Sequence, residues 1–519
     1  MNKIGFLFGA GAEISYGMPS GGKFALDIFR QSSEPGKQKL RDMRKNIDKR
    51  STYASRWLPN DYDKKSISSF GQRVFDTIIR DTIGNNRNKI IDKINHFDSL
   101  AEQSAKSIYS NNPEDALDSL NQRIETDLGY GIDYMNINQQ LAYNDLFKAG
   151  DNLFSNQYFA TLLYYYKDFE DFNDDDRNVL KELIIAIFQL QIGALSETLS
   201  RGLEDSIFKK DELNLDIFDD LGGTLNVNYE AAGIAGLKLL SNEYKNDTWH
   251  PIVKFAYKII EQIYSDVLDY KTLIDSNWHF LYNPKTEWGK FSKIIVFLYT
   301  VQEYIKNEAE SLDKTKSGYY SDLKIELESK KIEQSVIGTT NYSSFIKEVL
   351  KTDISFLNGG IDIYYDPYMN SIVDYKDSKH ILVPLLFTQS GTKPMTSIDM
   401  SERYVDFYRS LKDSNIICSI GFGFNQDDEH INGIIRTLIE RDNKKLVVVD
   451  TNSSKRLTDK RTELCGKLKI SKQENLDFIT VDKYTRKTKD GSMWYDDLIA
   501  NLGNIDIKWF FYYLDRNMI

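Results

Sequence analysis

The sequence has few cysteines and no long apolar segment, and each scarcity excludes a class of protein. Two cysteines, Cys418 and Cys465, among 519 residues are too few for a disulfide framework or for a zinc site with four cysteine ligands. No apolar run approaches the roughly 18 residues of a membrane span. Gly9, Gly11 and Glu13 interrupt the N-terminal apolar segment too early for a signal peptide. We therefore expect a cytoplasmic protein that does not enter a membrane.

The sequence also has fewer basic than acidic residues. Lys and Arg number 66 against 77 Asp and Glu, which gives a formal net charge of -11. This balance argues against a general nucleic-acid coat, because phosphate binding needs concentrated Lys and Arg. The exception is Lys37 to Arg50, which holds seven basic residues in fourteen. Nucleic acid or an acidic partner is one interpretation of this segment, but a solvated face is the more common one and the one we expect.

The sequence has the composition of a folded protein, with 41% hydrophobic and 28% charged residues. A chain of this length predicts about two to four domains. It opens with a short apolar segment (4–8), a glycine-rich turn (9–22) and a segment with helical spacing (23–30). Residues 31–330 then carry long stretches with helical periodicity, at 138–168, 178–200, 229–245, 251–270 and 288–312.

From about residue 331 short apolar runs alternate with helical segments. The expected strands are 335–338, 354–357, 381–387, 416–420, 446–449 and 478–481, and the expected helices are 343–350, 401–411 and 428–440. The predicted fold class is α/β, with a Rossmann-like, mostly parallel sheet and a large all-helical insertion after the first strand–helix unit. The predicted domains are 1–30 with 331–519, and the inserted helical domain 31–330.

A glycine motif, Gly9-Ala10-Gly11, stands between the first strand and the first helix. Glycines at such a turn let the backbone approach a pyrophosphate, and the next helix N-terminus offers amide donors. Glycines at a strand–helix turn are as often residues of a tight turn alone. The continuation, Gly17-Met18-Pro19, makes the motif more specific.

Three further segments end expected strands. They are Val336 to Tyr342 (VIGTTNY), Ile416 to Asn425 (IICSIGFGFN), and Leu446 to Asp450 followed by Thr451 and Asn452. Together with the opening glycine loop, these segments resemble, in order, the motifs of the sirtuin (SIR2) family. VIGTTNY is most similar to the version found in SIR2-like proteins of bacterial defence systems. The resemblance covers residues 4–30 and roughly 331–485, and leaves the helical insertion uncovered.

The resemblance implies an NAD site at the carboxyl ends of the strands. Asn341 would act on the nicotinamide ribose. Its carbonyl can stabilise positive charge or orient a water, and its NH₂ can bond a hydroxyl. The implied cofactor-binding residues are Gly9, Ala10, Gly11, Glu13, Pro19, Thr340, Gly421, Phe422, Asp450 and Asn452.

The chain also departs from the family pattern. The four zinc cysteines are absent, no arginine follows Pro19, and Ser343 stands where an Asp is usual. Asn358 occupies the place of the catalytic His of an HG turn, and His380 is the rival candidate for that role. His380 can equally be a polar residue that begins a strand.

A further group, Asp427, Asp428, Glu429 and His430, superficially suggests metal ligands. Acidic residues are favoured at a helix start, however, so we expect no metal.

Deacylation needs a base for a ribose hydroxyl, which is the role of the histidine in the His-Gly turn. Because Asn358 replaces this histidine, the sequence favours attack by water over deacylation. The sequence therefore predicts an NAD glycohydrolase, with NAD as substrate. Its resemblance to defence proteins implies anti-phage action by NAD depletion. The helical domain would control activity through homo-oligomerisation or a partner protein that acts as activator or sensor. The alternatives are a non-catalytic module that binds NAD or ADP-ribose, and a deacylase or ADP-ribosyltransferase.

Overall fold

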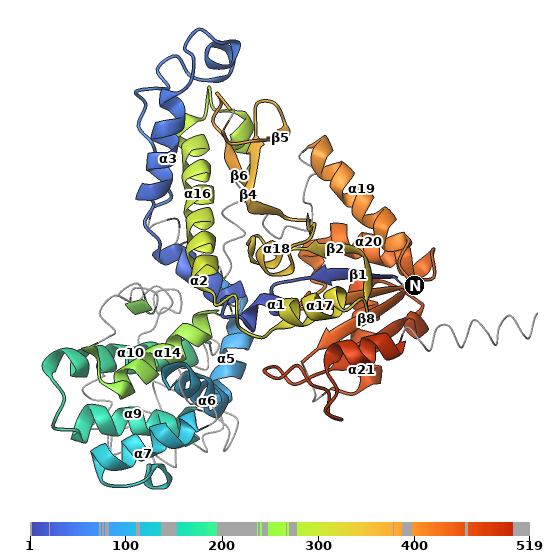
Figure 1. Ribbon diagram of the computed structural model, residues 1–519. Coiled ribbons are helices and arrows are strands. Elements are labelled where there is room, and N and C mark those ends of the chain that lie inside the picture. Colours follow the sequence, from blue (N-terminus) through green and yellow to red (C-terminus); the bar gives the residue numbers. More distant parts are fainter. Residues whose placement is uncertain are drawn as a thin grey trace, which may run out of the picture. The chain divides into compact units, whose positions relative to one another are not determined.

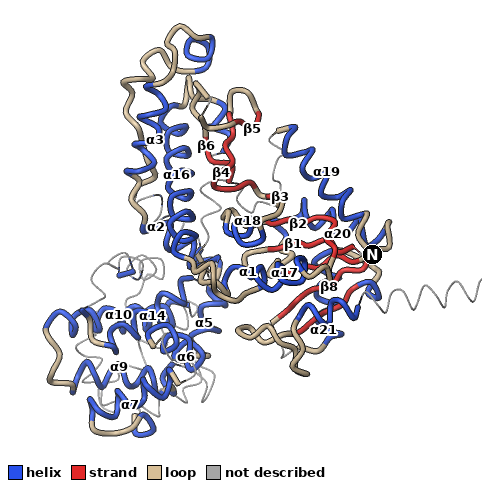
Figure 2. Tube along the Cα trace, viewed as in Figure 1, coloured by secondary structure: helices blue, strands red, loops and turns tan. Residues whose placement is uncertain are grey.

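A computed structural model provides the coordinates. It describes residues 3–19, 21–71, 74, 77, 82–109, 115–135, 153–194, 236, 239–240, 248–265, 267–268, 278–376, 378–386, 397–451 and 455–501. Figure 1 labels the elements for which there is room, and Figure 2 separates helices from strands by colour.

Six parallel strands form the main sheet, in the order β3-β2-β1-β7-β8-β9. Their bounds are β1 (Lys3–Phe8), β2 (Glu333–Thr339), β3 (Ser355–Phe356), β7 (Ile416–Ile420), β8 (Lys445–Asp450) and β9 (Leu476–Thr480). Numbered within this sheet alone, the order is 3-2-1-4-5-6, that of doubly wound dinucleotide-binding folds. The α/β class and the mostly parallel sheet are confirmed.

Alternation along the strands explains why the sheet has two buried faces. Successive side chains of a strand point to opposite faces, so the apolar runs supply two cores. Phe6 and Phe8 of β1 belong to one core with Cys418 of β7, whereas Leu7 and Ile417 belong to the other. Each of these side chains is fully buried.

Helices cover both faces of the sheet. The core that contains Phe6 is closed by α17 (Tyr319–Glu328), α18 (Phe345–Leu350) and the residues around Trp494. The opposite core is closed by α19 (Ile398–Lys412), α20 (Glu429–Glu440) and α21 (Leu457–Leu468). Three of these helices correspond to the segments predicted at 343–350, 401–411 and 428–440.

A second, antiparallel sheet has the order β5-β4-β6. It consists of β4 (Gly359–Asp366), β5 (Ser371–Val373) and β6 (Val383–Leu386), and it packs on α16 (Trp288–Ser311), which also contacts α3 (Glu34–Lys45). The strand expected at 381–387 therefore exists, but it belongs to this small sheet and not to the parallel one. Strands β4 and β5 were not predicted from the sequence.

The remaining regular elements are helical. The longer ones are α2 (Gly21–Arg30), α5 (Arg87–Asn95), α6 (Phe97–Ile108), α7 (Ala116–Leu128), α9 (Gln157–Asp168), α10 (Asp174–Ala194) and α14 (Pro251–Ser265). The short ones are the π-helix η1 (Tyr53–Trp57) and the 3₁₀ turns η2 (Ile132–Tyr134), η3 (Leu153–Ser155), η5 (Trp278–Tyr282), η6 (Gln426–Asp428) and η7 (Gln473–Asn475). The helices expected at 178–200, 251–270 and 288–312 correspond to α10, α14 and α16. That at 138–168 is described only from residue 153, and that at 229–245 lies almost entirely outside the described residues.

The contacts divide the chain into two compact units. One comprises residues 1–20, 31–70 and 271–519, and the other comprises 21–30 and 71–270. This division differs from the predicted domains, 1–30 with 331–519 and 31–330. The first unit takes in α3, α16 and α17, because these helices contact the two sheets or each other, and α2 contacts α14 of the second unit.

Two surface properties also bear on the sequence predictions. None of the described helices combines the length and the apolar character needed to cross a membrane. Several basic side chains of the segment 37–50 form ion pairs with nearby acids, which include Lys37 and Arg41 with Glu34, and Lys49 with Asp63. Binding of nucleic acid or of an acidic partner by this segment stays the alternative interpretation.

Candidate functional site

The site lies where the strand order reverses, between β1 and β7. In open α/β sheets ligands bind at such switch points, outside the carboxyl ends of the strands. The turn after β1 and the turn after β7 meet there: Gly9 N donates to Ile420 O at 3.0 Å, and Gly11 N donates to Gly421 O at 3.0 Å. The first and third of the predicted motifs are therefore in direct contact.

The glycines of these turns are required by their packing. A Cβ on Gly9 would lie 2.6 Å from Gly421 O, and one on Gly421 would lie 2.2 Å from Ala12 N. Gly421 also has a φ of +69°, a region in which side chains are strained. Close approach of two backbones thus accounts for the glycine motif without reference to a ligand.

The backbone amides of the first turn are largely engaged within the protein. Besides Gly9 and Gly11, Ala12 N donates to Gly9 O and Glu13 N donates to Ala10 O. The helix that follows, α1 (Gly11–Ile14), is a single turn. The expected cradle of amides for a pyrophosphate is therefore reduced, and among the described residues of this turn the exposed Ala10 alone keeps an N–H without a hydrogen bond.

Asn341, which follows β2, is hydrogen-bonded to the same turn. Its Nδ2 donates to Gly9 O at 3.2 Å and to Tyr320 Oη at 3.1 Å. A carbonyl oxygen can only accept, so the NH₂ must face Gly9 and the carbonyl oxygen must face the other way. No described residue donates a hydrogen bond to Asn341 Oδ1. Although the residue is only 7% exposed, its acceptor oxygen is thus available to another molecule.

Glu13 is a buried carboxylate in the same network. It is 3% exposed and accepts hydrogen bonds from Ser343 Oγ at 2.9 Å and from Tyr320 Oη at 3.1 Å. Burial raises the pKa of Glu13 to about 7, against smaller lowering effects of the hydrogen bonds, of which that from Ser343 is the largest. A carboxylate that titrates near neutrality next to a candidate catalytic amide is typical of functional sites.

Tyr320 reaches this network from the first turn of α17. Tyr16 holds that turn, because its hydroxyl accepts from Tyr320 N at 2.9 Å and from Ser321 N at 3.0 Å. The rings of Tyr16 and Tyr320 are stacked, with centroids 5.5 Å apart. The hydroxyl satisfies amides that a helix start leaves unbonded, and it fixes the position of Tyr320.

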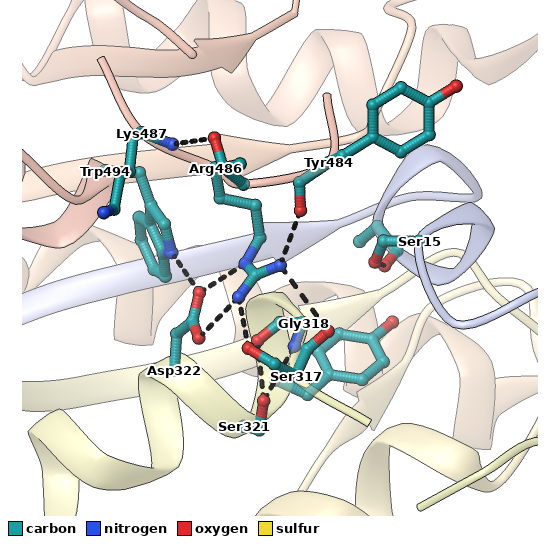
Figure 3. A network of polar contacts seen from close by, with 12 residues as sticks. Ser15, Ser317, Gly318, Ser321, Asp322, Tyr484, Arg486, Lys487 and Trp494 are labelled. Atoms are coloured by element: carbon teal, nitrogen blue, oxygen red, sulfur yellow. Dashed lines mark hydrogen bonds and ion pairs between the residues drawn. The ribbon is translucent and has the colours of Figure 1, made fainter. Parts of the chain in front are cut away.

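A second group fixes α17 from the C-terminal part of the chain (Figure 3). Arg486 forms two hydrogen bonds to Asp322, at 2.6 and 3.1 Å, and Trp494 Nε1 donates to the same carboxylate at 3.0 Å. Arg486 also donates to Ser317. The first turn of α17 is therefore held on both sides.

Asn358 is the residue that was predicted to stand at the position of the sirtuin histidine. It is 1% exposed; its Nδ2 donates to Thr340 O at 3.4 Å, and its Oδ1 lies 3.2 Å from Nε2 of His430 in α20. Tyr404 packs edge-on against His430 and donates to Leu357 O at 2.7 Å. The structure thus places a histidine beside the Asn358–Thr340 pair, although from a different element than the sequence analysis considered.

His380 lies in a different environment. Its Nδ1 is 2.6 Å from Asp366 Oδ2, and its ring stacks on Tyr53 with centroids 4.0 Å apart. Both neighbours belong to the part of the structure around the antiparallel sheet and η1. The described contacts of His380 include none with Asn341 or Asn358, so the structure does not bring this candidate to the other site residues.

The remaining predicted site residues are spread along the strand ends. Thr340 N donates to Phe8 O at 2.9 Å, which joins β2 to the glycine turn. Phe422 is buried in the core with Phe424, and Pro19 is half-buried. Asp450 ends β8, and its carboxylate lies 2.9 Å from Lys460 Nζ. Asn452 lies outside the described residues.

Tyr320, Ser343 and His430 contact predicted site residues but were not predicted as site residues themselves. Tyr320 was assigned to the helical domain, Ser343 was noted only as a departure from the family, and His430 was set aside with its acidic neighbours. Within the described part of the chain, no three His, Cys, Asp or Glu side chains form a group suited to a metal. Nothing in the sequence links Tyr320 to Glu13, which lies 307 positions away.

Comparison with known proteins adds no relative. No family model, no curated protein and no solved structure matches this chain significantly.

The glycine contact predicts a sharp difference between two substitutions. Gly421→Ala should destabilise the protein by on the order of 3 kcal/mol or more, because it adds both backbone strain and a clash with Ala12. At Gly433 in α20 an added Cβ would meet no atom within 4 Å, so Gly433→Ala should stabilise the protein by up to about 1 kcal/mol. Denaturant unfolding of both variants measures this, and equal effects would contradict the packing argument.

The environment of Glu13 predicts how stability depends on pH. Between its usual pKa of 4.5 and about 7, the folded protein keeps a proton that the unfolded chain releases. The free energy of unfolding of the wild type therefore falls as pH rises through this range, and Glu13→Gln removes that loss. From about pH 5 to about pH 8 the variant should gain up to roughly 3 kcal/mol relative to wild type. A difference between the two proteins that stays constant with pH would show that Glu13 titrates normally.

Proposed function

We propose that the protein is a SIR2-like NAD glycohydrolase that cleaves NAD to nicotinamide and ADP-ribose. The observation that carries this proposal is the hydrogen bond from Asn341 Nδ2 to Gly9 O. It joins the opening glycine turn and the T-T-N-Y segment at the switch point of a sheet with the dinucleotide-binding strand order. The family motifs, far apart in the sequence, thereby share one place in the fold.

The chemistry of the site suits this reaction. Cleavage of the nicotinamide–ribose bond develops positive charge on the ribose, as in other glycosidic cleavages. An amide oxygen held in advance, as Asn341 Oδ1 is, can stabilise that charge or orient a water, without reorganisation during the reaction. The water then takes the place of the acyl group that a deacylase would use.

Two features favour hydrolysis over deacylation. Asn358 cannot act as a base, and its two side-chain groups already face Thr340 and His430. The four zinc cysteines of deacylases are absent from the sequence. Action in anti-phage defence through NAD depletion, with control by homo-oligomerisation or a partner protein, is the biological role that the resemblance suggests.

A nucleotide-binding module without catalysis is the second candidate. The engaged amides of the glycine turn and the missing HG histidine favour it. Such a module would bind NAD or ADP-ribose, and the bound nucleotide would change its interaction with a partner protein.

Nicotinamide release from NAD by the purified chain, across a range of protein concentrations, tests the proposal. Asn341→Ala should lower the rate by at least about 100-fold, because it removes a group that acts at the reacting ribose. Asn475→Ala, the same change in the turn η7 (Gln473–Asn475), should leave the rate unchanged. Equal rates for Asn341→Ala and wild type would refute the site assignment. ADP-ribose binding without turnover would favour the second candidate.

A further inference from the structure

We propose that Glu13 is a positioning residue of this site, whose ionised carboxylate acts through Tyr320 on the Asn341 amide and whose protonation lowers the activity. This inference rests on the proposed function, which it deepens by adding a built-in dependence on pH. The family resemblance assigned Glu13 only to cofactor binding.

The hydrogen bonds of the network run in one direction. Tyr320 has a single hydroxyl hydrogen, and it points to Glu13 Oε1 at 3.1 Å. The Tyr320 oxygen is therefore free to accept from Asn341 Nδ2, also at 3.1 Å. Ser343 donates its hydrogen to the carboxylate. With Glu13 ionised, each of these donors has an acceptor.

This arrangement connects a charge to the candidate catalytic amide. Two bonds of 3.1 Å connect Glu13 Oε1 to Asn341 Nδ2 through Tyr320, and a side-chain hydrogen bond from Asn341 also lowers the pKa of Glu13 directly. Hydrogen bonds in a chain polarise one another, most of all in a buried environment. Donation from Asn341 towards a hydroxyl that itself donates to a carboxylate therefore draws electron density onto Asn341 Oδ1, where a ribose cation would be stabilised. Protonation of Glu13 removes the charge that drives this polarisation.

The groups around Glu13 leave it as the titrating member of the network. Tyr320 from α17 is the titratable group that contacts it, and both burial and the charge of Glu13 raise the pKa of Tyr320. Tyr16, stacked on Tyr320, also has a pKa raised by burial. Asp322 of α17 is paired with Arg486. Within the described residues Glu13 forms no ion pair with a Lys, Arg or His, and burial raises its own pKa to about 7.

The pH dependence of nicotinamide release, from about pH 6 to about pH 8, tests the inference. The wild-type rate should rise through pH 7 and then level off. Glu13→Gln should lower the plateau roughly tenfold, less than the loss of a directly acting group, and should abolish the rise. Tyr320→Phe should lower the plateau as well, because it removes the link that the Tyr320 hydroxyl forms between Glu13 and Asn341.

A serine pair supplies the matched control. Ser343→Ala removes a donor to the ionised carboxylate, so the rise should move to higher pH. Ser329→Ala, whose hydroxyl bonds a backbone carbonyl at the end of α17, should leave the rise in place. A purely structural Glu13 would give variants of altered stability with an unmoved pH profile. A rise that persists in Glu13→Gln belongs to another group and overturns the inference.

The two proposals fail in distinguishable ways. If the wild type releases no nicotinamide at any pH, the hydrolase function is rejected, and the affinity for ADP-ribose is measured over the same pH range. ADP-ribose has no group that titrates near neutrality. An affinity that rises through pH 7 in wild type but not in Glu13→Gln supports the role of Glu13. An affinity independent of pH in both proteins, or no binding at all, overturns it.

Discussion

The site depends on two turns that pack backbone against backbone. Because the turns that begin at Gly9 and Gly421 carry no side chain at their contact, β1 and β7 end at the same place and hold the carbonyl of Gly9 still. That carbonyl dictates which way the amide of Asn341 faces. The amide of Asn341 donates a hydrogen bond to the Tyr320 hydroxyl, and this hydroxyl donates one to Glu13. The close packing of Gly9 against Gly421 thus sets the orientation of the hydrogen bonds in this network.

Much of the parallel sheet could be predicted from the sequence, because its strands are short apolar runs that end at a glycine or a polar residue. The antiparallel sheet could not. Strand β4 has the sequence GGIDIYYD, in which no continuous apolar run marks a strand. The run 381–387 is apolar enough to suggest the main sheet, yet it pairs with β4 instead, opposite Gly359, Gly360, Tyr364 and Tyr365.

The candidate site was predictable only in part. Motifs at strand ends predicted that Gly9, Asn341 and Gly421 would meet, because the carboxyl ends of parallel strands share one edge. The sequence does not indicate in the same way which polar side chains are buried or which distant residues they contact. Glu13 is one acidic residue in a glycine-rich turn, and burial raises its pKa, while its hydrogen-bond partners Tyr320 and Ser343 lie 307 and 330 positions away. His380 was an attractive candidate by type alone, and it stacks on Tyr53 instead.

The central place of β1 has a consequence for how the chain is made. Its residues pair on one side with 333–339 and on the other with 416–420. At a synthesis rate of about 5–20 residues per second, the strand exists for roughly 20–80 s before its second neighbour emerges. Until residues 333–339 emerge, an apolar segment that ends in Phe6, Leu7 and Phe8 has no strand to pair with. Strand β1 is therefore made long before the two strands that complete its hydrogen bonding.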